Sequence, residues 1–303
     1  MRRITAIMMA LALAATGLTP WAQTGSALSF KDARGITVSL PAKARRVVSL
    51  SPAITEILYA AGAGPAVVGV TTYCNFPAEA QAVAKIGGFS PNTVSIEAIV
   101  ALKPDLVLGE LSAHGQLGAE FERSGVRFAA LPQTNFESVF QAIELLGRVA
   151  GDEQKSKSLV ASLRARMAAI AAKTAAIPAD KRPIVFWETW DEPLMSVGPH
   201  AFTGQIIEAA GGRNCFYDSQ ADWPVVSFEA VLARDPDYIM AADSHGAALT
   251  PERLARRPGW SALKAVRLGH VVLLDGDIVS RPGPRLVDAL EQMARVLYPA
   301  LFN

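Results

Sequence analysis

Two pairs of histidine and acidic residues are the side chains of this sequence whose types could do chemistry together. His114 follows Glu110 just beyond one predicted strand, and His245 follows Asp243 just beyond another. One imidazole and one carboxylate from each of two segments could form a metal or cofactor site. No two histidines have the helical i, i+4 spacing of metal ligands, and no dense cluster of ligand residues surrounds them. We therefore favour solvent-exposed loop histidines and no metal site, with ligation by His114 and His245 as the alternative.

Sequence motifs of enzymes are absent. The chain contains no Gly-x-Ser-x-Gly turn, no phosphate-binding Walker loop and no His-Glu-x-x-His zinc motif. No activated nucleophile or complete ligand set can be assembled, so we expect a protein that is not an enzyme and has no catalytic residues. An exported metal-dependent hydrolase that uses Glu110, His114, Asp243 and His245 is the distant alternative.

Composition restricts the class of protein further. The chain has 303 residues, of which 50% are hydrophobic and 19% charged, as expected for a globular protein with a large core. The 29 basic residues balance 28 acidic ones, so we expect no nucleic acid partner. Two cysteines, Cys74 and Cys215, allow at most one disulfide, and they could equally be free thiols.

Several aromatic residues stand in turn-rich segments and not in predicted core strands. Tyr73, Phe89, Trp190 and Trp223 each have glycine, proline, asparagine or aspartate close by. Such residues can simply anchor loops. Near strand ends, however, several of them together suit a cleft for a large flat or amphipathic ligand.

The elements that must position these residues alternate between strands and helices. Short runs rich in β-branched residues recur between helical patterns, which predicts parallel sheets covered by helices. The predicted strands are residues 46–50, 66–70, 105–109, 127–131, 184–188, 238–242 and 270–275. A helix is expected to begin at Ser51-Pro52, and Gly62 and Gly64 end it.

An internal repeat indicates two related lobes. Residues 94–108 align without gaps with residues 226–240, and seven of the fifteen positions are identical. Each copy predicts a short helix capped by serine, a Pro-Asp turn and a buried strand. Glu97 and Glu229 occupy the same position in the two copies.

A long helical pattern lies between the two copies. Residues 152–176 place Leu159, Leu163, Met167 and Ile170 on one face. Such a helix would be about 37 Å long, the width of a small domain. We therefore predict an α/β fold with two Rossmann-like lobes, residues 28–151 and 178–303, joined by a single long helix over 152–177, with a ligand cleft between the lobes.

The N-terminal residues have the order of a secretory signal peptide. Arg2 and Arg3 precede an apolar stretch over 4–18, and small and polar residues follow over 22–27. We predict a signal peptide over 1–27, cleaved after Ala22 or Ala27. No cysteine lies near the cleavage region to carry a lipid, so we expect a periplasmic protein.

Three sets of residues resemble one known family. The segment 46–62, the paired Glu-Ala-x-x-Ala-x-x-Pro-Asp segments and Arg281-Pro-Gly-Pro-Arg285 are similar to those of substrate-binding proteins of cobalamin, haem and siderophore ABC importers. The likeness covers nearly the whole mature chain. It is greatest to the cobalamin-binding members, through residues 73–77, 218–227 and 277–281.

The resemblance implies a function and a set of site residues. It implies a monomer without a cofactor that captures cobalamin, a vitamin B12-type corrinoid, and delivers it unchanged to the transmembrane subunits of an ABC importer. Glu97 and Glu229 resemble the acids that dock on arginines of those subunits. The implied ligand-binding residues are Tyr73, Phe89, Trp190, Trp223, Asp277 and Arg281.

Other ligands of the same family stay open. Glu110 stands where the cobalamin-binding members have a large aromatic residue, and a carboxylate near His114 could favour a cationic or metal-bearing ligand. Haem would find a possible axial ligand in Tyr73, His114 or His245. A ferric siderophore would call for more cleft arginines than Arg281 and Arg285.

Overall fold

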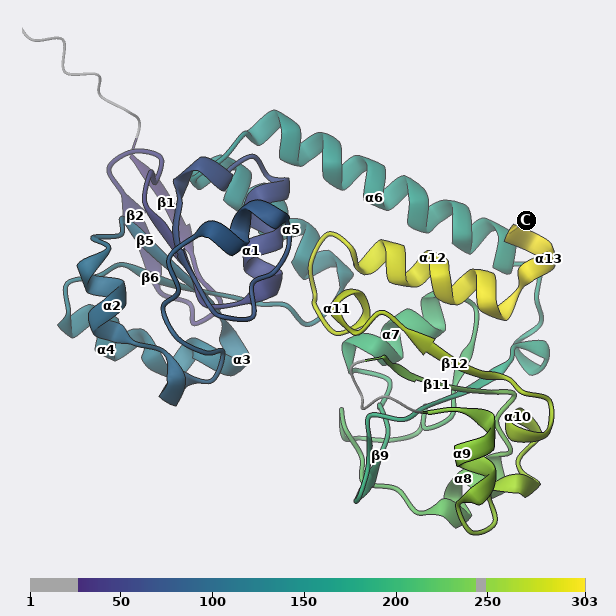
Figure 1. Ribbon diagram of the computed structural model, residues 1–303. Coiled ribbons are helices and arrows are strands. Elements are labelled where there is room, and N and C mark those ends of the chain that lie inside the picture. The colour runs from purple at the N-terminus through teal and green to yellow at the C-terminus, as the bar shows by residue number, and fades with distance from the viewer. Residues whose placement is uncertain (1–26, 244–248, 303) are drawn as a thin grey trace, which may run out of the picture.

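Two parallel β-sheets, one in each lobe, form the framework of the protein (Figure 1). The computed structural model describes residues 27–243 and 249–302. Apart from Ala27, the predicted signal peptide lies outside the described residues, and so does His245. The predicted α/β fold with two lobes and a ligand cleft is confirmed.

The N-terminal lobe is built on a four-stranded sheet with the order β4-β3-β5-β6. All residues of β3 and β6 are buried, as expected for parallel strands with helices on both faces. The strands are β3 (Val47–Ser49), β4 (Val67–Val70), β5 (Leu106–Glu110) and β6 (Phe128–Leu131), with an antiparallel hairpin, β1 (Leu28–Lys31) and β2 (Thr37–Leu40). The helices are α1 (Pro52–Ala60), α2 (Ile96–Ala101), α3 (Leu111–His114), α4 (Gly118–Arg123) and α5 (Phe136–Val149).

The C-terminal lobe repeats this sheet with the order β10-β7-β11-β12. Its strands are β7 (Ile184–Trp187), β10 (Arg213–Asn214), β11 (Tyr238–Ala242) and β12 (Val271–Leu274), with a small hairpin, β8 (Trp190–Asp191) and β9 (Leu194–Met195). Its helices are α7 (Phe202–Ala209), α8 (Phe228–Arg234), α9 (Pro251–Arg256), α10 (Lys264–Arg267), α11 (Gly276–Val279), α12 (Leu286–Leu297) and α13 (Pro299–Phe302).

The two sheets have the same topology. In each parallel sheet the first strand lies second from one edge, the second strand lies at that edge, and the third is interior. The sequence repeat maps onto α2 with β5 and onto α8 with β11, the matching interior strand of each sheet. Ser95 and Ser227 cap the two helices through backbone N–H groups three residues on, both at 3.2 Å. The repeat in sequence is therefore a repeat in structure.

A single long helix, α6 (Glu153–Thr174), joins the lobes and runs along one side of both (Figure 1). Asp152 caps it by accepting from the backbone N–H of Lys155. Leu163 belongs to the core of the N-terminal lobe and Ile170 to that of the C-terminal lobe. Arg166 bonds Asp288 and Glu291 of α12, at 2.6 and 2.8 Å, and these bonds raise the pKa of the guanidinium. Contacts along its length thus tie α6 to both halves.

Candidate functional site

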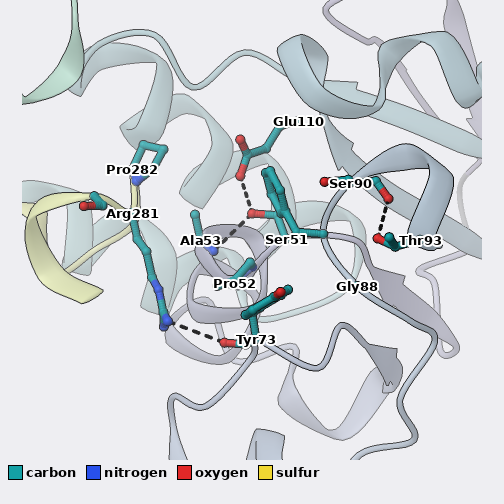
Figure 2. Close-up of a pocket in the computed structure, with 12 residues that line it drawn as sticks. Ser51, Pro52, Ala53, Tyr73, Gly88, Ser90, Thr93, Glu110, Arg281 and Pro282 are labelled. Atoms are coloured by element: carbon teal, nitrogen blue, oxygen red, sulfur yellow. Dashed lines mark hydrogen bonds between the residues drawn. The ribbon is translucent and has the colours of Figure 1, made fainter. Parts of the chain in front are cut away.

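A cavity of about 480 Å³ lies where the two lobes face each other. Its lining comes from four N-terminal segments and one C-terminal loop, most of which Figure 2 labels. The lining residues are 51–53 at the start of α1, Tyr73, 88–90 with Thr93, Glu110 at the end of β5, and 280–282 after α11. A pocket at the carboxyl ends of parallel strands is the usual ligand site of an open α/β sheet.

The Gly87 to Thr93 loop brings Phe89 to the cavity. Gly87 has φ +111°, and a Cβ there would lie 2.1 Å from the carbonyl oxygen of Thr93, so no other residue fits without moving the loop. The Thr93 hydroxyl donates to the carbonyl of Ser90 at 2.7 Å and closes the turn (Figure 2). The loop is therefore held in one shape against the cavity.

His114 is a buried residue that ties this loop to β5, so its predicted exposure was wrong. Its side chain is fully buried, Nδ1 accepts from the backbone N–H of Glu110 at 3.1 Å, and Nε2 lies 2.8 Å from the carbonyl of Phe89. Because Nδ1 accepts, the ring proton is on Nε2 and is donated to Phe89. Burial lowers the pKa of His114, which keeps the ring neutral. Both ring nitrogens are occupied, so His114 positions two cavity residues and has no nitrogen for a metal.

Glu110 places its carboxyl group at the inner wall of the cavity. The Ser51 hydroxyl accepts from the backbone N–H of Ala53 and donates to Oε1 of Glu110 (Figure 2). Burial raises the pKa of the Glu110 carboxyl, and the hydrogen bond from Ser51 opposes part of that effect. Oε2 of Glu110 has no hydrogen-bond partner within residues 27–243 and 249–302.

Polar contacts between the lobes hold the lining residue Arg281 in place, and we call them the inter-lobe network: Glu56, Asn75, Asp277, Arg281 and Arg285. Arg281 donates to Asn75 at 2.6 Å and to Asp277 at 2.5 Å, and Asn75 donates to Asp277 at 2.7 Å. Arg285 forms two bonds to the buried Glu56, at 2.6 and 2.8 Å, and these raise the pKa of its guanidinium. Arg281 adds a contact to Glu56 at 3.3 Å.

Sequence analysis did not single out Glu56. The available signal was an acid inside an apolar helix, because every residue over 53–58 is buried. A buried carboxylate needs a charged partner, which the two arginines of the 281–285 segment supply.

Three of the six predicted ligand contacts line the cavity and three do not. Tyr73, Phe89 and Arg281 line the cavity, and Tyr73 is 60% exposed. Asp277 does not line the cavity but bonds the lining residue Arg281.

The predicted tryptophans lie on the C-terminal lobe, and neither belongs to the cavity lining that the structure describes. Trp190 and Trp223 are 53% and 59% exposed. Trp190 pairs with Met195, which in turn forms a β-bridge to Val225, so the two segments are neighbours. They present aromatic surface to solvent beside the C-terminal sheet.

Cys74 and Cys215 are both free and buried, so the open possibility of a disulfide between them is removed. The thiol of Cys74 lies 3.2 Å from the hydroxyls of Thr55 and of Thr71. Burial raises the pKa of Cys215 to about 12, which keeps that thiol protonated and unreactive.

Residues 27–243 and 249–302 contain neither a candidate metal site nor a helix that could cross a membrane. No group of three or more histidine, cysteine or acidic side chains there could hold a metal ion. No helix in the same residues has the length and apolarity needed to cross a membrane.

Two equivalent lobes with a cavity between them define a bilobal α/β substrate-binding protein. The model of the periplasmic binding protein family matches residues 47–278, so the chain belongs to that family.

Three relatives illustrate the range of the family. A Bacillus subtilis protein described as an uncharacterized ABC transporter substrate-binding lipoprotein is 32% identical over 281 residues, with 91% of this chain and 87% of the relative covered. The vitamin B12-binding protein of Salmonella typhimurium is 32% identical over 255 residues, with 84% of this chain and 90% of the relative covered. The structure of a periplasmic haem-binding protein from Roseiflexus matches with a TM-score of 0.74 and 27% sequence identity. The match covers 85% of this chain and 99% of that protein.

Proposed function

We propose that this chain is a periplasmic protein that captures cobalamin and delivers it to the transmembrane subunits of an ABC importer. The observation that carries the proposal is the inter-lobe cavity lined by Tyr73 and Phe89. The aromatic rings of the cavity and the polar backbone groups of its lining loops suit a corrinoid, because the edge of a corrinoid mixes apolar surface with amides. The likeness to a vitamin B12-binding protein supports this ligand.

We also propose how the protein is exported and in which oligomeric state it acts. The predicted signal peptide would export the chain, which would act as a monomer without a cofactor and without altering its ligand. No catalytic role is assigned to any residue. We further propose two lobes over residues 28–151 and 178–303, joined by the helical segment 152–177.

Haem is the second candidate ligand. The similar Roseiflexus structure is of a haem-binding protein, and the exposed phenol of Tyr73 at the cavity is a possible axial ligand. His114 cannot serve, because both of its ring nitrogens bond backbone groups. A ferric siderophore has less support, because Arg281 and Arg285 already pair with protein carboxylates.

Trp223→Ala tests whether the exposed aromatic surface of the C-terminal lobe contacts the corrinoid. We expect cyanocobalamin to bind about two- to twelvefold more weakly, since one aromatic contact contributes about 0.5 to 1.5 kcal/mol beyond burial. Equilibrium dialysis measures the change.

The control is Leu268→Ala at the end of α10, because Leu268 is 57% exposed, much like Trp223, and lies away from the cavity. It should bind as the wild type does. An unchanged affinity in Trp223→Ala would remove Trp223 from the site.

A further inference from the structure

The free oxygen of Glu110 is the feature of the cavity that the proposed function leaves without a role. Oε1 accepts from Ser51, whose hydroxyl has no second proton to give, and Oε2 has no partner in the described part of the chain. The carboxyl group lines the cavity. A ligand group at this wall would meet an acceptor that is already oriented.

The charges around the cavity leave Glu110 unmatched. Among the lining residues only Arg281 and Glu110 are charged. Arg281 lies 2.5 Å from Asp277 and 3.3 Å from Glu56, and Arg285 lies 2.6 Å from Glu56. Two guanidinium groups therefore face two carboxylates, and none of the described lining residues supplies a further cation to balance Glu110.

The groups packed against Glu110 do not change this balance. His114 is neutral and bonds only backbone groups, and Ser51 donates its single proton. Burial raises the pKa of Glu110, so mildly alkaline buffer favours the charged form in which both oxygens accept.

We propose that Glu110 is the specificity residue of the cavity: its free oxygen accepts a hydrogen bond from an N–H donor of the ligand, such as a primary amide, and its charge rejects a carboxylate at the same place. The inference rests on the proposed function, since a corrinoid carries primary amides along its edge. An anionic ligand would be repelled, because like charges in a partly buried site are poorly screened.

The test compares cyanocobalamin with its monocarboxylic acid derivatives, in each of which one amide is replaced by a carboxylate. Calorimetric titrations at pH 8 use the wild type, Glu110→Gln, and the control Glu120→Gln, an exposed acid on α4. We expect the wild type and the control to bind the amide form at least about 30-fold more tightly than one of the acids. Glu110→Gln should reduce that preference to about threefold or less.

Two results would overturn the inference: an equal preference in the wild type and in Glu110→Gln, or no preference in the wild type. Thermal unfolding of Glu110→Gln checks that the variant is folded.

A wild type that binds no corrinoid would refute the proposed ligand without deciding the role of Glu110. The same comparison is then made with haemin and its dimethyl ester. Binding of the ester in preference to haemin, lost in Glu110→Gln, supports the role of Glu110. Equal binding of the two by the wild type overturns it.

Discussion

Replacing Glu97 and Glu229 together by alanine should abolish ligand uptake while leaving ligand affinity unchanged. Both side chains are exposed in the first turn of equivalent helices, α2 and α8, which lie on the side of the lobes away from α6 (Figure 1). Under the proposed docking, a permease with two-fold symmetry would receive one acid from each lobe. Loss of an interfacial charge pair costs about 2 kcal/mol or more, so each acid should contribute about 30-fold or more to the docking affinity.

The chain supplies a matched control for this experiment. Glu252 follows the capping Thr250 by two residues, as Glu229 follows Ser227, and it is exposed on α9. In both cases hydrogen bonds from the residue's own N–H and from the capping hydroxyl lower the pKa of the carboxyl. Glu252→Ala therefore removes the same helix-end contribution without touching the proposed docking position.

Uptake of labelled cyanocobalamin by cells that depend on this chain, together with calorimetry of the purified variants, measures both quantities. The Glu252→Ala protein should support normal uptake. Normal uptake by the double variant, or a parallel loss of ligand binding, would contradict the docking role.

Glu56→Gln should cause the largest loss of stability among single changes in the inter-lobe network. Glu56 is 3% exposed and accepts two bonds from Arg285 and one from Arg281, which belong to the other lobe. The glutamine amide carries no charge, so Arg281 and Arg285 would both lose the carboxylate that Glu56 supplies. Breaking a buried ion pair by removing one partner costs about 3 to 5 kcal/mol.

Urea denaturation measures this loss, and a surface ion pair provides the reference. Glu137 pairs with Arg164 at 2.6 Å, but both side chains are about half exposed. Glu137→Gln should therefore cost less than about 1 kcal/mol. Equal unfolding midpoints for the two variants would show that the inter-lobe network does not hold the lobes together.

The alternation of strands and helices and the internal repeat could be read from the sequence because they are local patterns. Buried parallel strands need runs of apolar residues. Helix α6 needs one apolar face, because Leu163 on that face packs into the core of the N-terminal lobe and Ile170 into that of the C-terminal lobe. The serine caps and the Pro-Asp turns then indicated the same unit of helix, turn and strand once in each lobe. These signals specify the lobes and their helix without any knowledge of distant contacts.

The inter-lobe network and the role of His114 could not be predicted in the same way. Glu56 and Arg285 are joined only when the lobes meet, and no local period relates them. His114 follows a strand end, a position typical of exposed loops, yet the close return of the Phe89 loop buries it. The short strands β8 to β10 were also missed, because two-residue strands carry no detectable alternation.

Calorimetric titration of the mature protein with cyanocobalamin tests the central claim most directly, because heat and stoichiometry report binding without assuming which residues form the site. The proposed function predicts a saturable isotherm with one corrinoid per chain and a dissociation constant in the micromolar range or tighter. No binding of cyanocobalamin by folded protein that binds haemin saturably would contradict it and would make haem the ligand of this cavity.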